Sequence, residues 1–179
     1  AYDREDAYSG SEIELNDSLL EVVRRVSDLK QMYAYVTKPA ILKSKEEIHG
    51  VILKGMDSSY DASFYRKDLR EGEWTDFFQL ISVAVAAILN VSPGDKITAH
   101  FVQDPPRARV FTVKGIYDTG FKEYDEMLAV CDIRHLQKLN NWAPREVSGI
   151  AVELNDMKRI LELEAELDDA FPMNQDDDF

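Results

Sequence analysis

Cysteine and long apolar runs are nearly absent from this 179-residue chain. Its single cysteine, Cys131, has no partner for an internal disulfide. The most apolar stretch, Leu80 to Leu89, contains Ser82 and is far shorter than the about 18 residues that a membrane-spanning helix requires. The length is enough for one domain, and we expect that domain to have two lobes.

Positive charge is also scarce, with 21 Lys or Arg against 34 Asp or Glu and a net charge of −13. An acidic chain repels nucleic-acid phosphates and anionic lipid headgroups. We therefore expect no nucleic-acid binding and no broad electrostatic docking on a membrane. Arg107 and Arg109 form a local exception to this acidic character.

The motifs of nucleotide and ester chemistry are missing too. Gly94-Asp95-Lys96 lacks the preceding glycine and the following helix of a phosphate-binding loop, and no serine nucleophile elbow occurs. The candidate carboxylates show no spacing typical of a paired general acid and base; they are Asp57, Asp61, Asp125 and Glu126. We predict that the chain is not an enzyme.

Metal and cofactor binding are not indicated either. The histidines His49, His100 and His135 fall on separate predicted elements and share no ligand spacing with Cys131. Cys131 closes the apolar stretch that begins at Met127, which favours a buried core thiol over a reactive one. We therefore expect neither a metal nor a cofactor.

A pattern of strands and helices is present at the start of the chain. The expected elements are a strand at Ser11–Leu15, a helix from Ser18 to about Gln31, and strands at Met32–Leu42 and Ile48–Met56. The strand and helix return near the other end, as a strand at Gly149–Leu154 and a helix whose apolar residues run from Met157 to Leu167.

Four residues recur at these two places: Glu14-Leu15-Asn16-Asp17 is matched by Glu153-Leu154-Asn155-Asp156. The match is either a coincidence or a structural repeat, and a repeat would pack two strand-helix units on one sheet. The last residues, Asn174 to Phe179, lack the ligand spacing of a calcium loop and are predicted to form a solvated acidic tail.

The middle of the chain predicts an apolar helix at Leu80–Val91 and then a β-hairpin at residues 96–117. Its strands would be Lys96–Val102, with Ile97, Ala99 and Phe101 inward, and Arg109–Tyr117, with Phe111 and Val113 inward. Prolines cannot donate to a strand ladder, so the hairpin tip is placed at Gln103 to Ala108.

This tip is the candidate partner-binding site. Its residues are Gln103, Asp104, Pro105, Pro106, Arg107 and Arg109. One interpretation is a tight connection with no further role. The other is a recognition surface, because a proline-stiffened loop loses little entropy on docking and the two arginines could meet an acidic partner.

The stretch from Leu89 to Ile133 carries four motifs in a particular order. They are Leu89-Asn90-Val91, Ser92-Pro93-Gly94-Asp95-Lys96, Arg109-Val110-Phe111-Thr112-Val113-Lys114-Gly115-Ile116 and Thr119-Gly120-Phe121-Lys122-Glu123-Tyr124-Asp125. In this order they resemble the periplasmic domain of lipoprotein-releasing ABC transporter permeases. A weaker likeness extends to Gly50–Asp57 and Val147–Leu154.

The resemblance implies an α+β fold of two lobes. A porter-like lobe would comprise residues 1–57 and 145–179, and an inserted lobe, residues 58–144, would carry the hairpin. Macrolide-exporter (MacB-like) and FtsX-like permeases are related and share this core. The residues that match the family motif are expected to be structural, with aromatic side chains packing the lobe; they are Gly94, Asp95, Gly115, Gly120, Phe121, Tyr124 and Asp125.

The resemblance also implies a place in the cell. The chain would be a non-catalytic ectodomain between two membrane helices, on the periplasmic face of the inner membrane of a Gram-negative bacterium. Through its parent protein it would work with a cytoplasmic ATPase subunit and a second permease subunit. ATP-driven motion would release lipoproteins to a periplasmic chaperone. Ala1 and the region near Phe171 should then emerge on the same side.

The length of the hairpin tip leaves an alternative open. Family members that recruit the chaperone carry a longer hook with a Phe-Thr-Pro sequence, whereas the tip here is only Gln103 to Ala108. The alternative is an ectodomain of an efflux or cell-envelope signalling permease of the MacB or FtsX kind.

Overall fold

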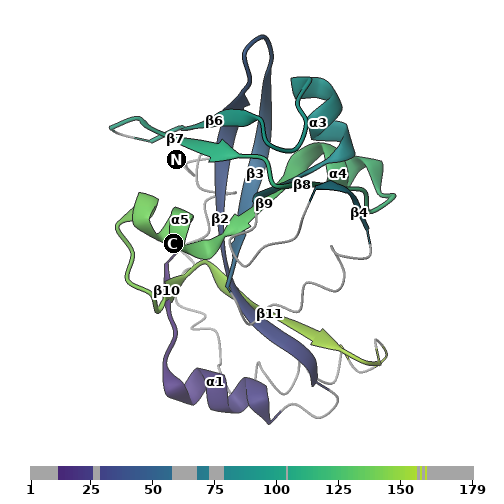
Figure 1. The fold of residues 1–179 in the computed structure, drawn as a ribbon. Helices are drawn as coiled ribbons and strands as arrows, with labels where there is room; N and C mark the ends of the chain where they lie inside the picture. Colours follow the sequence, from purple (N-terminus) through teal and green to yellow (C-terminus); the bar gives the residue numbers. More distant parts are fainter. Residues whose placement is uncertain are drawn as a thin grey trace, which may run out of the picture.

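A nine-stranded mixed sheet organises the fold in the computed structural model, which describes residues 12–25, 29–57, 68–72, 79–103, 105–156, 158 and 160. The sheet order is β4 (Leu69–Gly72), β8 (Gly115–Tyr117), β5 (Gln79–Ser82), β9 (Leu128–Asp132), β3 (Ile48–Met56), β2 (Leu29–Lys43), β6 (Lys96–Phe101) and β7 (Arg107–Thr112), and β11 (Gly149–Leu154) also pairs with β2. The pairs β3–β9 and β5–β8 are parallel and the others are antiparallel (Figure 1). The fold class is α+β.

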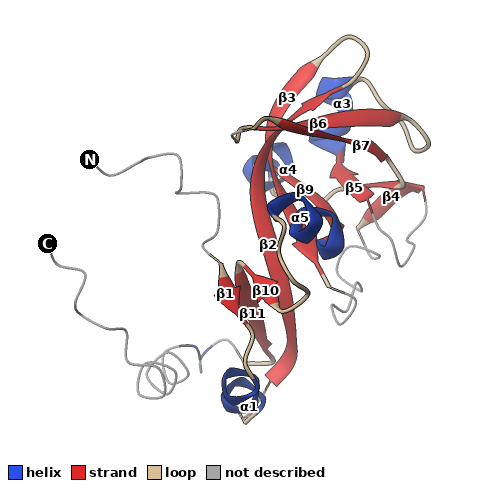
Figure 2. Cartoon of the chain, turned by 90° about the vertical axis from the view of Figure 1, so that its left-hand side faces the viewer, coloured by secondary structure: helices blue, strands red, loops and turns tan. Residues whose placement is uncertain are grey.

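The other elements within the described residues are four helices and a small second sheet. They are α1 (Asp17–Arg24), α3 (Val83–Leu89), α4 (Lys122–Met127), α5 (Ile133–Asn140), and the paired strands β1 (Ile13–Glu14) and β10 (Glu146–Val147). Figure 2 shows α1, β1, β10 and β11 together at the lower end of the molecule. The β2–β3 turn and α3 lie at the opposite end (Figure 1).

Strand β2 runs through most of this length and has 15 residues. One edge pairs with β3, while the other pairs first with β11 and then, from Ile41, with β6. Thr37 donates its backbone N–H to Ser148 Oγ at 3.2 Å, on the second edge. Alternate residues face the same edge, so the nitrogen of Pro39 falls in the gap between β11 and β6. Proline has no backbone N–H, and it is tolerated inside this long strand because no neighbouring strand in the described part of the chain accepts a hydrogen bond at this position.

The main core lies between the sheet and helices α3 and α5, which stand on the same side of β2 in Figure 2. Val85 and Leu89 of α3 and Leu136 and Leu139 of α5 are fully buried there. The inward residues predicted for the hairpin are confirmed, since Ile97, Ala99, Phe101, Phe111 and Val113 are all buried.

Both core helices begin and end with specific caps. Ser82 Oγ accepts from Val85 N at 3.1 Å at the start of α3, and Asp132 accepts from Arg134 N at the start of α5. Each ends at an asparagine in the left-handed region, Asn90 with φ 51° and Asn141 with φ 60°. Asparagine tolerates this conformation and closes the last turn of the helix.

The helix predicted from Leu80 begins later than expected. Leu80 and Ile81 belong to β5, and the helix starts at Val83. Strand β5 lies between β8 and β9, and a strand buried on both faces has the continuous apolar sequence of a buried helix.

The helix predicted to reach Gln31 is also too long, since α1 ends at Arg24. Residues Leu29 to Gln31 are the start of β2 because they pair with β11, Leu29 opposite Leu154 and Gln31 opposite Glu153. A pairing partner 120 or so positions away cannot be read from local periodicity.

The strand predicted at Arg109–Tyr117 is two strands, so the hairpin ends at Thr112 rather than at residue 117. After Val113 the chain turns into β8, which pairs with β4 and β5 at the other side of the sheet. A Cβ on Gly115 would lie 2.8 Å from Leu69 Cδ1 and 2.9 Å from Leu80 Cδ2. A larger residue here would therefore require both leucine side chains to move.

The two Glu-Leu-Asn-Asp segments do not pack on one sheet as a repeat requires. The first segment begins with Glu14, the last residue of β1 in the two-stranded sheet. The second begins with Glu153 and Leu154, the last residues of β11 in the nine-stranded sheet. The expected helix to Leu167, the Asn174–Phe179 tail, and the positions of Ala1 and Phe171 lie outside the described residues.

The division into two lobes stays a prediction. Strand pairing links the two proposed lobes, because β2 and β3, from residues 1–57, pair with β6 and β9, from residues 58–144. Any two lobes are thus joined by continuous strand pairing.

Replacing Gly55 by alanine should destabilise the domain by about 1–3 kcal/mol, because overpacking forces neighbours apart. A Cβ at Gly55 would lie 2.8 Å from the backbone Cα of Ile133. Gly50→Ala is the control, since its Cβ would meet nothing within 4 Å. Urea unfolding of both variants checks this, and equal stabilities would contradict the close approach of β3 to α5.

Candidate partner-binding hairpin

The candidate site is the hairpin of β6 and β7. The two strands pair from Lys96 opposite Thr112 to Phe101 opposite Arg107, and β7 lies at one end of the sheet order. Val102, Pro105 and Pro106 are exposed at the tip, Val102 to 74%. Gln103 is half-buried there, and Asp104 lies outside the described residues.

The tip is shorter than predicted, because Arg107 and Ala108 already belong to β7. Arg107 lies opposite Phe101 and Ala108 lies opposite His100. Strand β6 ends at Phe101 and β7 begins at Arg107, so the connection is short and its two prolines lie where no ladder donor is needed.

Arg107 turns back onto the domain instead of projecting from the tip. Its Nη1 donates to the carbonyl oxygen of Leu139 at 2.6 Å and to Asn141 Oδ1 at 3.3 Å. Lys38 Nζ donates to Asn140 Oδ1 at 2.8 Å beside it. Two cations thus meet the C-terminal end of α5, where the partial negative charge of a helix collects.

These contacts give the hairpin a fixed base. Burial lowers the pKa of Lys38, and the charge of Arg107 lowers that pKa further. Neither the Lys38 nor the Asn141 contact was identified from the sequence. The signal available was Asn141 itself, because asparagine is common just after a helix end.

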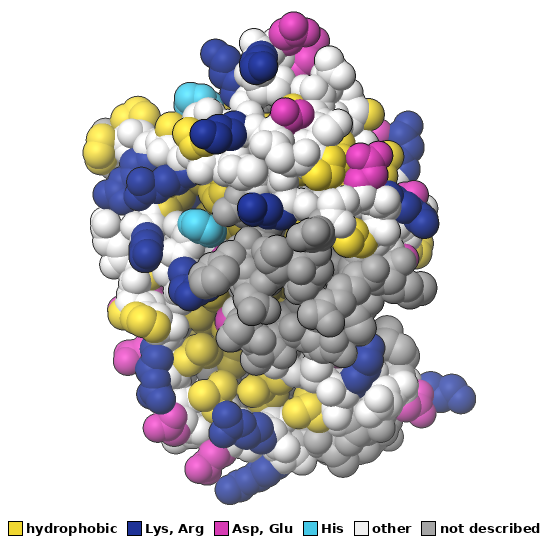
Figure 3. Space-filling model, viewed as in Figure 1, with side chains coloured by type: hydrophobic (Ala, Val, Ile, Leu, Met, Phe, Trp, Pro, Cys, Tyr) yellow, Lys and Arg dark blue, Asp and Glu magenta, His cyan; other side chains and the backbone are white. Residues whose placement is uncertain are grey.

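Arg109 is exposed on β7, as a residue that meets a partner must be. Close by, the ring of Phe111 packs edge-on against His135 of α5, with ring centroids 5.4 Å apart. Burial lowers the pKa of His135, and Lys138, Arg134 and Arg109 lower that pKa further against the opposing effect of Asp132. Figure 3 shows Lys and Arg side chains along the left side of the molecule, over the hairpin and α5.

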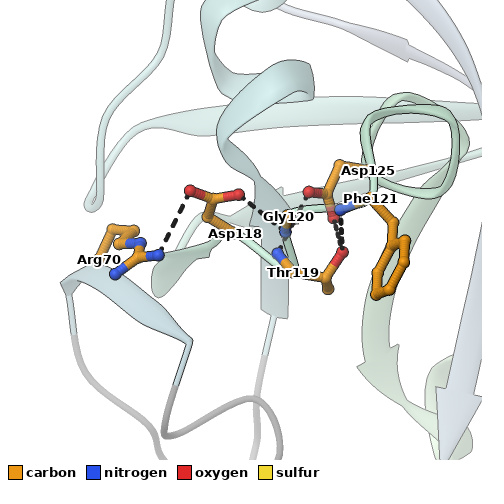
Figure 4. A network of polar contacts seen from close by, with 6 residues as sticks. All are labelled: Arg70, Asp118, Thr119, Gly120, Phe121 and Asp125. Carbon is orange, nitrogen blue, oxygen red and sulfur yellow. Dashed lines mark hydrogen bonds and ion pairs between the residues drawn. The ribbon is translucent and has the colours of Figure 1, made fainter.

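The motif residues from Thr119 to Asp125 form a separate polar network at α4 (Figure 4). Asp125 is only 4% exposed and accepts from Thr119 N at 3.2 Å and Thr119 Oγ1 at 2.8 Å. Asp118 accepts from Gly120 N and forms an ion pair with Arg70 at 3.4 Å. Gly120 has φ 80°, a conformation that favours glycine.

The aromatic residues of this motif do not pack the lobe as expected. Phe121 is 73% exposed and Tyr124 is 41% exposed. In Figure 4 the Phe121 ring points away from the polar network, whereas the Asp125 carboxylate is turned into it.

The remaining motif residues shape the connection into and out of the hairpin. Gly94, with φ 97°, donates to the carbonyl of Val113 at 2.8 Å, and Asp95 accepts from Ser92 N through its side chain. The Thr119–Asp125 network follows β8, which lies near the end of the sheet opposite β7. The structure therefore does not bring the hairpin tip and this network into one site.

The other candidate groups within the described residues do not come together in one site. Cys131 is buried, which confirms the predicted core thiol, and burial raises its pKa. His49, His100 and His135 lie on β3, β6 and α5, and within the described ranges no three His, Cys, Asp or Glu side chains are arranged to hold a metal. In the same ranges, no helix has the length and apolar character that crossing a membrane requires.

The fold is that of the extracytoplasmic domains of MacB-like ABC permeases. The periplasmic region of MacB from Actinobacillus actinomycetemcomitans matches with a TM-score of 0.55 and 17% identity, over 90% of this chain and 79% of that one. The extracellular domain of the noncanonic ABC-type transporter YknZ from Gram-positive bacteria also matches with a TM-score of 0.55, at 20% identity over 87% of this chain and 84% of that one.

In sequence, the chain is a distant homologue of LolC. It is 29% identical to the lipoprotein-releasing system transmembrane protein LolC of Neisseria meningitidis over 147 residues, 74% of this chain, and 28% identical to LolC of Xylella fastidiosa over 106 residues. It spans 35% of the length of the Neisseria protein and 24% of the Xylella protein. No family model matches the chain.

Arg107→Met should lower stability by about 1–3 kcal/mol, because it leaves the Leu139 carbonyl and Asn141 without their charged donor. Arg109→Met is the matched control and should change stability by less than about 0.5 kcal/mol, as exposed substitutions usually do. Chemical denaturation measures both, and an equal effect of the two variants would contradict the anchoring role of Arg107.

Asp125→Ala should cost about 1–3 kcal/mol, since it removes the two hydrogen bonds that the buried carboxylate accepts from the half-buried Thr119. Glu126→Ala, which removes only a surface ion pair with Lys122, should cost less than about 1 kcal/mol. Thermal unfolding monitored by circular dichroism distinguishes the two. A small loss for Asp125→Ala would show that the network is not structural.

Proposed function

We propose that this chain is the extracytoplasmic domain of an ABC transporter permease that releases lipoproteins from the inner membrane. The observation that carries the proposal is the relationship to LolC, a lipoprotein-releasing system transmembrane protein, over 74% of this chain. The similarity to MacB and YknZ domains supports a position outside the cytoplasm.

In this proposal the domain lies on the periplasmic face of the inner membrane and carries no catalysis. Its parent protein pairs with a cytoplasmic ATPase subunit and a second permease subunit, and ATP-driven motion moves the domain. The first and last described strands, β1 and β11, lie at one end of the molecule, which is compatible with two flanking membrane helices at that end (Figure 2).

The hairpin tip is the proposed contact for a periplasmic lipoprotein chaperone or its lipoprotein cargo. Pro105 and Pro106 stiffen the tip, and Arg107 fixes its base on α5, so little flexibility is lost on docking. Arg109 is exposed on the adjoining strand and offers a positive charge to an acidic partner.

A second candidate is an ectodomain that serves efflux or cell-envelope signalling. The short tip of residues 102–106 favours it, because a short tip offers less surface than a long hook for capturing a chaperone. The fold similarity to MacB and YknZ domains is compatible with both candidates.

Titration calorimetry of the 179-residue chain with the periplasmic lipoprotein chaperone of its organism tests the proposal. We expect saturable binding that weakens at least about tenfold, or about 1.4 kcal/mol, when Pro105→Glu and Arg109→Glu are combined. Lys114→Glu, an exposed charge reversal outside the hairpin strands, is the control and should leave affinity unchanged. Absence of binding at high concentration would favour the efflux or signalling candidate.

A further inference from the structure

An apolar groove of about 390 Å³ lies on the sheet face opposite the main core, where its lining residue Ile52 also packs against a second, smaller buried cluster. Its lining residues include Pro39, Ile41, Gly50, Ile52, Val102 and Met127, which together define the outer sheet face. The volume falls within the about 300–1,000 Å³ range of ligand pockets. It is open to solvent, since Ile41 is 42%, Met127 52% and Val102 74% exposed.

Strand alternation places these side chains opposite the core. Ile41 lies between Ala40 and Leu42, which are 4% and 0% exposed, and Ile52 lies between the buried Val51 and Leu53. Helices α3 and α5 cover the other side of β2 (Figure 2). Within the described part of the chain, the only helical residue that lines the groove is Met127, at the end of α4.

Gly50 of β3 lines the groove directly opposite Ile41 of β2, and a Cβ built at Gly50 would meet nothing within 4 Å. Its backbone does not need the left-handed conformation, so glycine is not required there by the turn or by packing. The missing side chain instead leaves room above the sheet, between Ile41 and Ile52.

The charged side chains that the neighbouring strands place on this outer face are basic. Strand alternation puts Lys43, Lys54 and Lys96 on the same face as Ile41, and β3, β2 and β6 contain no Asp or Glu, although the whole chain has a net charge of −13. Lys43 and Lys96 are exposed at the upper end of β2 and at the start of β6, and His100 is exposed on β6.

We propose that the outer sheet face binds an extended, acidic protein segment, with an apolar side chain of that segment inserted over Gly50. Apolar side chains of the partner bury Ile41, Ile52 and Val102, and its carboxylates meet Lys43 and Lys96. Opposite charges of this kind guide association and set register. The proposal does not depend on lipoprotein release.

The location favours a protein over a membrane as the partner. Ile41 lies 12 residues along β2 from Leu29, the point where β11 pairs. At about 3.3 Å a residue, Ile41 is about 40 Å from the end of the molecule that holds β1 and β11. That is the end at which the flanking membrane helices are proposed, so the groove would lie far from the bilayer. A concave groove also fits a side chain better than a flat lipid surface does.

The test is a titration of the ¹⁵N-labelled 179-residue chain with a short synthetic peptide in which Leu and Glu alternate. We expect amide shifts centred on Ile41, Gly50 and Ile52, and a dissociation constant below about 1 mM. A matched peptide with Lys in place of every Glu should bind at least about tenfold more weakly, because it meets the positive charges of the face.

Two variants test the two parts of the proposal. Gly50→Leu fills the groove and should weaken peptide binding at least about tenfold, while its amide spectrum reports a preserved fold. Lys43→Glu combined with Lys96→Glu should produce a similar loss through charge. Lys114→Glu should leave binding unchanged.

Several results would overturn the proposal. The first is unchanged binding in Gly50→Leu, and the second is a set of shifts confined to the tip around Pro105. A third is binding of the chain to vesicles of phosphatidylglycerol and phosphatidylcholine but not to the peptide. If the Lys43→Glu and Lys96→Glu variant lost this vesicle binding, the partner would be a membrane instead. Self-association abolished by Gly50→Leu would identify a second copy. The chaperone titration uses tip variants, so its failure is separate from these outcomes.

Discussion

Every large part of this domain depends on strand β2. It is the only strand that pairs with three others in the nine-stranded sheet, as far as the described residues show. Its lower half holds β11, its upper half holds β6, and β3 follows its other edge. Ser148 and the nitrogen of Pro39 lie in the gap between β11 and β6 on that edge. The hairpin, the outer sheet face and the lower end are thus held in fixed relation by one continuous strand.

The polar groups inside the domain show how this arrangement is stabilised locally. Ser82 caps α3 and also donates its hydroxyl to the carbonyl oxygen of Asp125, which connects α3 to α4. Tyr117 donates to the carbonyl of Leu128 at 2.8 Å, from β8 to β9. In these two pairs the partner is supplied by another element, and such satisfied pairs fix one arrangement of the elements.

Charge is distributed very unevenly along the chain, and the total conceals this. Residues 161–179 contain eight Asp or Glu and no Lys or Arg, whereas the strands β3, β2, β6 and β7 contain no acidic residue. The net charge argues against long-range attraction to phosphates. It does not describe the surface that a partner meets at the sheet, where positive and apolar side chains lie together.

The sequence by itself determined the α+β class, the inward residues of the hairpin, the buried thiol of Cys131 and the relationship to permease domains. These follow from local alternation, composition and motif order, which need no distant contact. Only the tertiary structure decided that β5 is a strand, that β2 begins at Leu29 and that Arg107 donates to the C-terminal end of α5. Each of these depends on a contact with residues far along the chain, such as Leu154 opposite Leu29 or the Leu139 carbonyl beside Arg107. The groove over Gly50 likewise exists only because neighbouring strands bring Ile41, Ile52 and Val102 to one face.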